Sequence, residues 1–240
     1  MRIAVLSDIH GNLPALEAVL GALKPFDALW QLGDVVGYGP QPDEVVARLA
    51  QENAIGVRGN HDAAAIGDLD TDSFNDDARF AVEWTAQRIS DTTRAWLSAL
   101  PQRSISEPFT LVHGSPRDPT WEYIFTSSIA RANLREFETT HCIVGHTHIP
   151  IAYVERDGRM EGLQPDDGAR LELGEQRVIA NPGSVGQPRD GDPRASAMVY
   201  DSDAATLEWH RVEYPIERVQ KLMTELKLPV RLVARLAFGL

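Results

Sequence analysis

The chain has 240 residues, 43% of them hydrophobic, which is enough to fill the core of one large domain or two small ones. Its formal net charge of −12 argues against a protein that binds nucleic acid through its overall field. The single cysteine, Cys142, excludes an internal disulfide and argues against a thiolate metal site.

The N-terminal stretch predicts a buried strand followed by a helix. Residues 3–6 form a short apolar run that ends in turn residues, which is typical of a parallel strand covered on both faces. The strand delivers Asp8 and His10 to its carboxyl end, where open α/β sheets place their ligands. While the chain stays extended, these two side chains leave on the same side and can share one divalent metal ion. Asn12 is expected to cap the helix that follows.

The next two apolar runs also end in polar residues. Residues 26–32 predict a strand that ends at Gly33-Asp34, and residues 42–53 predict a helix. Residues 55–57 predict a third short strand, which ends at the cluster Arg58-Gly59-Asn60-His61-Asp62. Two strand–helix–strand units in succession predict a parallel sheet with right-handed crossovers.

Residues 63–100 predict a solvated, aspartate-rich loop followed by helices. The spaced carboxylates resemble the start of a calcium loop, but the glycine and the closing glutamate that such a loop requires are missing. We therefore do not expect calcium there. An alternative is that this helical insertion forms a cap that selects the substrate.

The second half of the chain repeats the pattern of an apolar run followed by histidine. Residues 109–112 lead to His113, a helix is expected over 127–138, and residues 142–144 lead to His146 and His148. Residues 151–213 predict several antiparallel strands. Two helices are expected over 215–226 and 230–236, with apolar faces that pack within the subunit or, alternatively, form a homodimer contact. No linker or repeat divides the chain, so we expect a single domain over 1–240.

The polar clusters together predict a metal site. Imidazole and carboxylate ligands suit Mn, Fe, Co, Ni or Zn better than Ca or Mg. The candidate ligands outnumber those that one tetrahedral zinc needs, and they fit two ions with open positions. They are Asp8, His10, Asp34, Asn60, His113, His146 and His148.

The series Asp8-x-His10, Gly33-Asp34-x-x-Gly37, Gly59-Asn60-His61-Asp62, His113 and Gly145-His146-x-His148 resembles the calcineurin-like metallophosphoesterase superfamily. Asn181-Pro182-Gly183-Ser184 resembles a segment of its small bacterial and archaeal phosphodiesterase branch. The resemblance implies an α/β fold, a four-layer sandwich of two mixed β-sheets flanked by helices. It implies two divalent transition-metal ions, manganese first and Fe, Zn, Ni or Co as alternatives. One ion would bind Asp8, His10, Asp34 and His148; the other would bind Asn60, His113, His146 and the bridging Asp34.

The same resemblance implies the chemistry. The ions would activate a bridging water against a phosphodiester or, as the second choice, a phosphomonoester. His61 would act as the general acid, and Asn60 and Asp62 are further catalytic candidates. Independently of the resemblance, Arg58 and Arg189 are candidate phosphate contacts, with a position on the surface or behind the ligands as the favoured alternative for each. The serine/threonine phosphatases of the superfamily carry aspartate and arginine where this chain has Gly37 and Tyr38, and glutamate where it has Asp62. This departure argues against a dedicated protein phosphatase.

The rival hypothesis is a non-enzymatic scaffold, since a retromer subunit resembles the superfamily in fold and serves protein binding. The intact ligand set favours the enzyme, with a small phosphorylated substrate for which a nucleotide is one candidate. No apolar run reaches transmembrane length, and the N-terminal strand lacks the pattern of a signal peptide. We therefore expect a cytoplasmic protein without a membrane partner.

Overall fold

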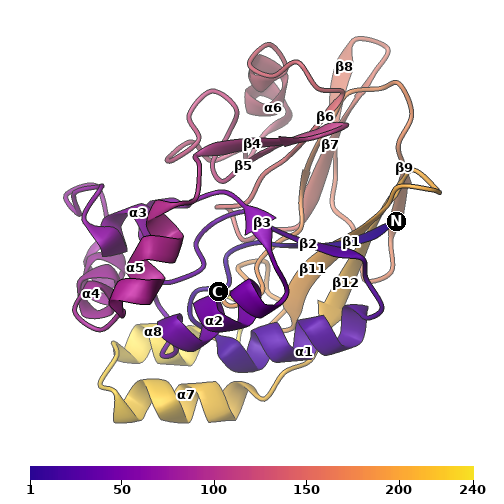
Figure 1. The fold of residues 1–240 in the computed structure, drawn as a ribbon. Helices are drawn as coiled ribbons and strands as arrows, with labels where there is room; N and C mark the ends of the chain where they lie inside the picture. Colours follow the sequence, from indigo (N-terminus) through magenta and orange to yellow (C-terminus); the bar gives the residue numbers. More distant parts are fainter.

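The structure is a computed structural model that describes residues 1–240, and it contains two six-stranded mixed sheets with helices on their outer faces (Figure 1). The first sheet has the order β3-β2-β1-β11-β12-β9. Its strands β1, β2 and β3 are mutually parallel, whereas β11 runs antiparallel to β1 and continues the sheet through β12 and β9. Their bounds are β1 Arg2–Leu6, β2 Ala28–Gln31, β3 Ile55–Gly56, β9 Arg170–Glu172, β11 Ala195–Asp201 and β12 Thr206–Val212.

The second sheet has the order β4-β5-β6-β10-β7-β8. The central strands β5, β6 and β10 are parallel, and the outer pairs β4–β5 and β7–β8 are antiparallel hairpins. Residues 151–213 are therefore antiparallel as predicted except at β10, which also pairs in parallel with β6. The bounds are β4 Arg103–Ser106, β5 Phe109–Val112, β6 His141–Ile143, β7 Ile151–Arg156, β8 Arg159–Leu163 and β10 Val178–Asn181.

The two sheets pack face to face, and helices cover the outer face of each. Val5 of β1, Met198 of β11 and Leu111 of β5 share one buried cluster between the sheets. Helices α1 (Leu13–Leu23), α2 (Pro42–Gln51), α7 (Ile216–Glu225) and α8 (Val230–Arg235) cover the first sheet, and α6 (Ser127–Asn133) lies over the second (Figure 1). The predicted four-layer α/β sandwich is confirmed. None of these helices is long and apolar enough to cross a membrane.

The burial of β1 explains the apolar sequence of its last four residues, which follow the exposed Arg2. Ala4 and Leu6 face the helix layer, whereas Ile3 and Val5 face the second sheet, so both faces of the strand are covered. The expected cap of the first helix is also present, because Asn12 Oδ1 accepts a hydrogen bond of 3.2 Å from the amide of Ala15.

The helical segment differs from the prediction at its start. Helix α3 (Asn60–Ile66) begins directly after Gly59, so Asn60 and His61 lie in its first turn and not in an extended strand end. Helices α4 (Asp76–Ala86) and α5 (Asp91–Ser98) follow after a loop, as expected. Other elements are shorter than predicted: β2 spans Ala28–Gln31, α2 ends at Gln51, β3 has two residues and α6 ends at Asn133.

Candidate metal centre

The candidate ligands meet at one edge of the sandwich because the parallel strands of both sheets end there. Asp8 and His10 follow β1, Asp34 follows β2, and Asn60 opens the helix after β3. The second sheet contributes the loops after β5 and β6. All seven candidate side chains converge on this edge and are at most 3% exposed: Asp8, His10, Asp34, Asn60, His113, His146 and His148.

The backbone brings them together in a way that the sequence did not predict. Asp8 and His10 do enter the same ligand group as expected, but the extended backbone that was expected to place them there is wrong. Strand β1 ends at Leu6, and both residues adopt left-handed φ angles, 52° and 50°. Asp34, His146 and His148 do the same, with φ of 51°, 66° and 61°. Such angles cost of order 1–3 kcal/mol each in residues with a side chain, and they tend to cluster at functional sites.

The ligand atoms form two groups that share one carboxylate. Asp8, His10, Asp34 and His148 each offer one atom within 4.8 Å of the others, and so do Asp34, His113 and His146. Asp34 Oδ2 lies 3.7 Å from His10 Nε2 on one side and 3.4 Å from His113 Nε2 on the other. Asp34 therefore stands between the two groups, which together are able to bind metal.

The orientation of two histidine rings fits a cation in the first group. His10 Nδ1 donates to the carbonyl of Val36 at 3.1 Å, and His148 Nδ1 donates to that of Gln187 at 2.6 Å. A neutral imidazole has one donor and one acceptor nitrogen, so both Nε2 atoms present lone pairs. These atoms lie 3.2 Å apart, and Asp8 Oδ1, 3.1 Å from His148 Nε2, has no hydrogen-bond donor. Three electron-rich atoms at this separation repel one another unless a positive charge lies among them.

A hydrogen bond to a main-chain carbonyl also orients a histidine ring of the second group. His113 Nδ1 donates to the carbonyl of Leu32 at 2.8 Å, which directs Nε2 toward Asn60 Oδ1 at 3.1 Å and His146 Nδ1 at 3.0 Å. Burial lowers the pKa of His113, but the Asp34 carboxylate outweighs this effect and raises the pKa to about 9. Without a metal, the cluster therefore holds a proton at this point. A bound ion would displace that proton.

The remaining ligands are already in the protonation states that metal binding requires. Burial alone would raise the pKa of Asp34, but the charges of His113 and His61 hold it well below its usual value. Burial lowers the pKa of His10 and of His146 far below the ordinary range. At neutral pH the aspartate is ionised and these two imidazoles are neutral.

His61 lies beside the two groups without belonging to either. Its ring packs against Tyr38 and edge-on to Phe74, with centroid separations of 4.4 and 5.1 Å. A Cβ atom at position 37 would lie 2.5 Å from His61 Nδ1, so only glycine fits there. Nδ1 is buried and has no hydrogen-bond partner, and burial lowers the pKa of His61 to about 4. Position 37, where the protein phosphatases carry an aspartate, is a glycine here, and no side chain from it reaches His61 Nδ1.

The other sequence candidates lie around the cluster. The carboxylate of Asp62 accepts hydrogen bonds of 3.0 Å from the amides of Val36 and Gly59, so it is directed at the backbone and not at His61. Burial, followed by the charge of Asp34, raises the pKa of Asp62 to about 7. Arg58 is paired with the exposed Asp68 at 2.7 Å, and the structure does not bring it into the cluster.

Arg189 is closer to the cluster. Its guanidinium lies 5.6 Å from the centroid of the Tyr38 ring and donates to Gln187 Oε1 at 2.9 Å. The Asn181–Ser184 segment positions the ligand loops: Ser184 Oγ donates to the carbonyl of Asp8 at 2.7 Å, and Asn181 Nδ2 donates to that of Gly145 at 2.7 Å.

Tyr123 is the neighbour that sequence reasoning missed. Its ring stacks on His146 with a centroid separation of 3.8 Å and an interplanar angle of 16°. Phe125 stacks on Tyr123 in turn, at 5.2 Å and 7°. These aromatic residues lie in an irregular loop between β5 and α6, where no periodic pattern marks a tyrosine as a neighbour of the site.

Comparison with known proteins identifies the family and the fold. Residues 1–205 match the sequence model of the calcineurin-like phosphoesterase superfamily domain. The chain is 48% identical to a metallophosphoesterase of Sphaerobacter thermophilus, whose crystal structure superimposes with a TM-score of 0.92 over 100% of this chain and 99% of the other. It is 36% identical to the uncharacterized protein MJ0912 of Methanocaldococcus jannaschii, over 99% and 98% of the two chains. It is 28% identical to the phosphodiesterase YfcE of Escherichia coli, over 86% and 91%.

Proposed function

Because this chain belongs to the calcineurin-like phosphoesterase superfamily, we propose that it is a phosphodiesterase that works with two divalent metal ions. The observation that carries the proposal is the position of Asp34, which is common to both groups of ligand atoms. A carboxylate can bridge two ions, and shared ligands of this kind hold the ions of dinuclear hydrolases close together. The similarity to YfcE, described as a phosphodiesterase, supports diesters over monoesters as the substrate.

The ligand groups divide between the ions as the geometry suggests. Asp8, His10 and His148 would hold the first ion, and Asn60, His113 and His146 the second, with Asp34 bound to both. Nitrogen and oxygen donors in these proportions suit a transition metal, and we propose manganese, with Fe, Zn, Ni and Co as alternatives. When bound, the ions would offset the charge of the phosphoryl group and lower the pKa of a water molecule for attack on phosphorus.

The protein itself contributes position and proton transfer. The hydrogen bonds from His10, His113 and His148 to main-chain carbonyls fix each ring with its Nε2 directed inward. His61 is neutral at pH 7 in the free protein, because burial lowers its pKa. The negative charge of a bound phosphate would raise that pKa, so that His61 can protonate the leaving oxygen as a general acid.

The contact between His61 and Gly37 bears on the class of substrate. No carboxylate orients His61 from position 37, and Asp62 is held by main-chain amides. This arrangement differs from the one that the protein phosphatases of the superfamily carry, and it supports a small phosphorylated substrate. Phe74, from the loop before α4, packs on His61, which supports a role for residues 63–100 as a cap.

The decisive experiment measures release of p-nitrophenol from bis(p-nitrophenyl) phosphate and from p-nitrophenyl phosphate. Purified protein is assayed with added Mn²⁺ and with a chelator, and its metal content is determined by elemental analysis. We expect two ions per chain, faster turnover of the diester, and loss of both activities with the chelator. Metal-loaded protein that hydrolyses neither ester would refute the proposal and favour the scaffold.

A further inference from the structure

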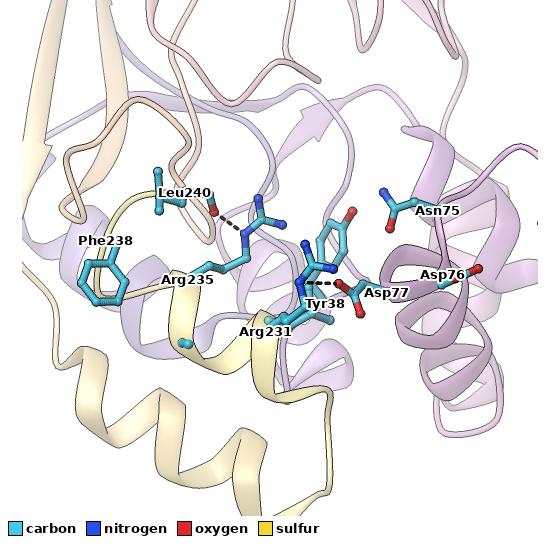
Figure 2. Close-up of a pocket in the computed structure, with 10 residues that line it drawn as sticks. Tyr38, Asn75, Asp76, Asp77, Arg231, Arg235, Phe238 and Leu240 are labelled. Atoms are coloured by element: carbon cyan, nitrogen blue, oxygen red, sulfur yellow. Dashed lines mark hydrogen bonds and ion pairs between the residues drawn. The ribbon is translucent and has the colours of Figure 1, made fainter.

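Tyr38 connects the candidate metal centre to a large cavity. This cavity, about 810 Å³, lies between the N-terminal end of α4 and the segment formed by α8 and the residues after it (Figure 2). The Tyr38 ring lines the cavity and also packs against His10 and His61, with centroid separations of 4.7 and 4.4 Å. A molecule in the cavity would therefore be next to a phosphoryl group held by the cluster.

Arg235 makes no ion pair with a side-chain carboxylate, although Asp76 and Asp77 line the same cavity. Its Nε donates to the main-chain oxygen of Leu240, and its two terminal nitrogens make no hydrogen bond within the protein (Figure 2). The side chain is partly buried, and burial lowers the pKa of Arg235. Terminal guanidinium nitrogens are strong donors that pair with phosphate in a planar, bidentate geometry. The two terminal nitrogens of Arg235 are therefore donors without an acceptor, at the wall of a cavity.

Arg189 adds a second positive charge between the cavity and the cluster. Besides lying over Tyr38, it belongs to the loop whose Gln187 carbonyl accepts from His148 Nδ1. The charge of Arg189 further lowers the pKa of Arg235, so the two guanidinium groups are close enough to repel each other. Neither forms an ion pair with an aspartate or glutamate, although the chain has 35 acidic residues. Two neighbouring guanidinium groups without a direct carboxylate partner attract an anion of double charge, even though Asp77 of the same cavity partly offsets Arg235.

Arg231 lines the same cavity and behaves differently. Its Nε lies 3.6 Å from the carboxylate of Asp77, and its side chain is 89% exposed (Figure 2). Its charge is thus offset by a neighbour and by solvent. Arg231 provides a matched control for Arg235, because it lies one turn earlier on the same helix.

We propose that this cavity is a second phosphate subsite, in which Arg235 and Arg189 bind a phosphate group other than the one that is hydrolysed. The inference rests on the proposed function and gives its substrate a class: organic phosphodiesters that carry a further phosphomonoester group. The exposed side chains of Phe238 and Leu240 also line the cavity and offer apolar contact to the organic part of such a molecule.

The test uses two chromogenic diesters that differ in one phosphate: thymidine 5′-(p-nitrophenyl phosphate) and its 3′-phosphorylated derivative. In the Arg235→Gln protein we expect KM for the derivative to rise about 10–100-fold with kcat unchanged, because a charge-assisted contact is lost. KM for the parent diester is expected to stay within about twofold. Arg235→Lys should retain part of the preference, and Arg231→Gln should retain all of it. Equal effects on both esters, or none on either, would overturn the subsite.

Binding measurements separate this inference from the proposed function. Wild-type protein that hydrolyses neither diester would refute the proposed phosphodiesterase activity. Calorimetry with thymidine 3′,5′-bisphosphate tests the subsite independently of that activity. Affinity lost in Arg235→Gln but kept in Arg231→Gln supports the subsite. The same affinity in wild type and Arg235→Gln, or equal losses in both variants, refutes it.

Discussion

Replacing Asp34 by asparagine tests the shared carboxylate with little change of shape. The amide oxygen can still accept the hydrogen bond of 2.9 Å that Asp34 Oδ1 receives from the amide of His61, so the loops should keep their positions. What disappears is the charge. The first ligand group retains the Asp8 carboxylate, but the second is left with Asn60, His113 and His146, all neutral donors.

The expected effect is large because one of the proposed ions loses its only anionic ligand. We expect the metal content of Asp34→Asn to fall from two ions per chain to one or none after dialysis. Turnover of the diester should fall by about 10³-fold or more, since a metal ion supplies several kcal/mol of transition-state stabilisation and each 1.36 kcal/mol is a factor of ten. Elemental analysis and p-nitrophenol release at increasing Mn²⁺ measure both quantities.

The matched control is Asp68→Asn, which also removes one carboxylate charge, but from an exposed ion pair with Arg58. It should keep both ions and full activity. An Asp34→Asn protein that keeps two ions and turns over like wild type would show that Asp34 does not bridge the metals, and the division of ligands proposed above would have to be abandoned.

Three further changes test the surroundings of the cluster. His61→Ala should keep both ions and lose about 10²–10⁴-fold in kcat, the range for a general acid, and loss of the ions would instead make His61 a ligand. Gly37→Ala places a Cβ 2.5 Å from His61 Nδ1 at a φ of 88°, and should lower the free energy of unfolding by about 1–3 kcal/mol. Urea denaturation measures this loss, and unchanged stability would contradict the close packing of His61 on Gly37. His141 is 3% exposed, and burial together with the charge of Arg177 lowers its pKa to about 4. Between these two pKa values, about 4 in the folded protein and 6.5 in the unfolded chain, His141 is protonated only in the unfolded chain. Between pH 6.5 and pH 4.5 the wild type should lose about 2–3 kcal/mol more stability than His141→Gln, and parallel losses in the two proteins would refute the assignment.

The strands, the first helix and the polar motifs were accessible from the sequence because each depends on local signals, whereas the sandwich of two sheets was expected from the resemblance to the superfamily. The run over residues 3–6 is apolar because β1 is covered on both faces there, and Asn12 caps the next helix with its own side chain. Each polar motif follows such a run directly. Parallel strands end at a common edge, so the order of the motifs along the chain was enough to predict which side chains meet.

The geometry of the loops was not accessible in this way. The left-handed angles of Asp8 and His10 are unfavourable for residues with side chains, so no propensity predicts them, and they exist because contacts from other loops hold them. One such contact is the hydrogen bond from Ser184 to the carbonyl of Asp8 across 176 positions of sequence. The stacking of Tyr123 on His146 and the approach of Arg235 to Tyr38 also join distant segments, and no periodic pattern marks them.

Because the ligand loops come from two different sheets, metal binding would affect the stability of the fold as well as the activity. Asp8, His10 and Asp34 follow strands of the first sheet, whereas His113, His146 and His148 follow strands of the second. Ions held between them would cross-link the two sheets at the edge where their parallel strands end. An ion that binds only the folded chain adds about 2.7 kcal/mol of stability at a hundred times its dissociation constant. The lifetime of this protein in a metal-starved cell would then shorten together with its catalytic capacity.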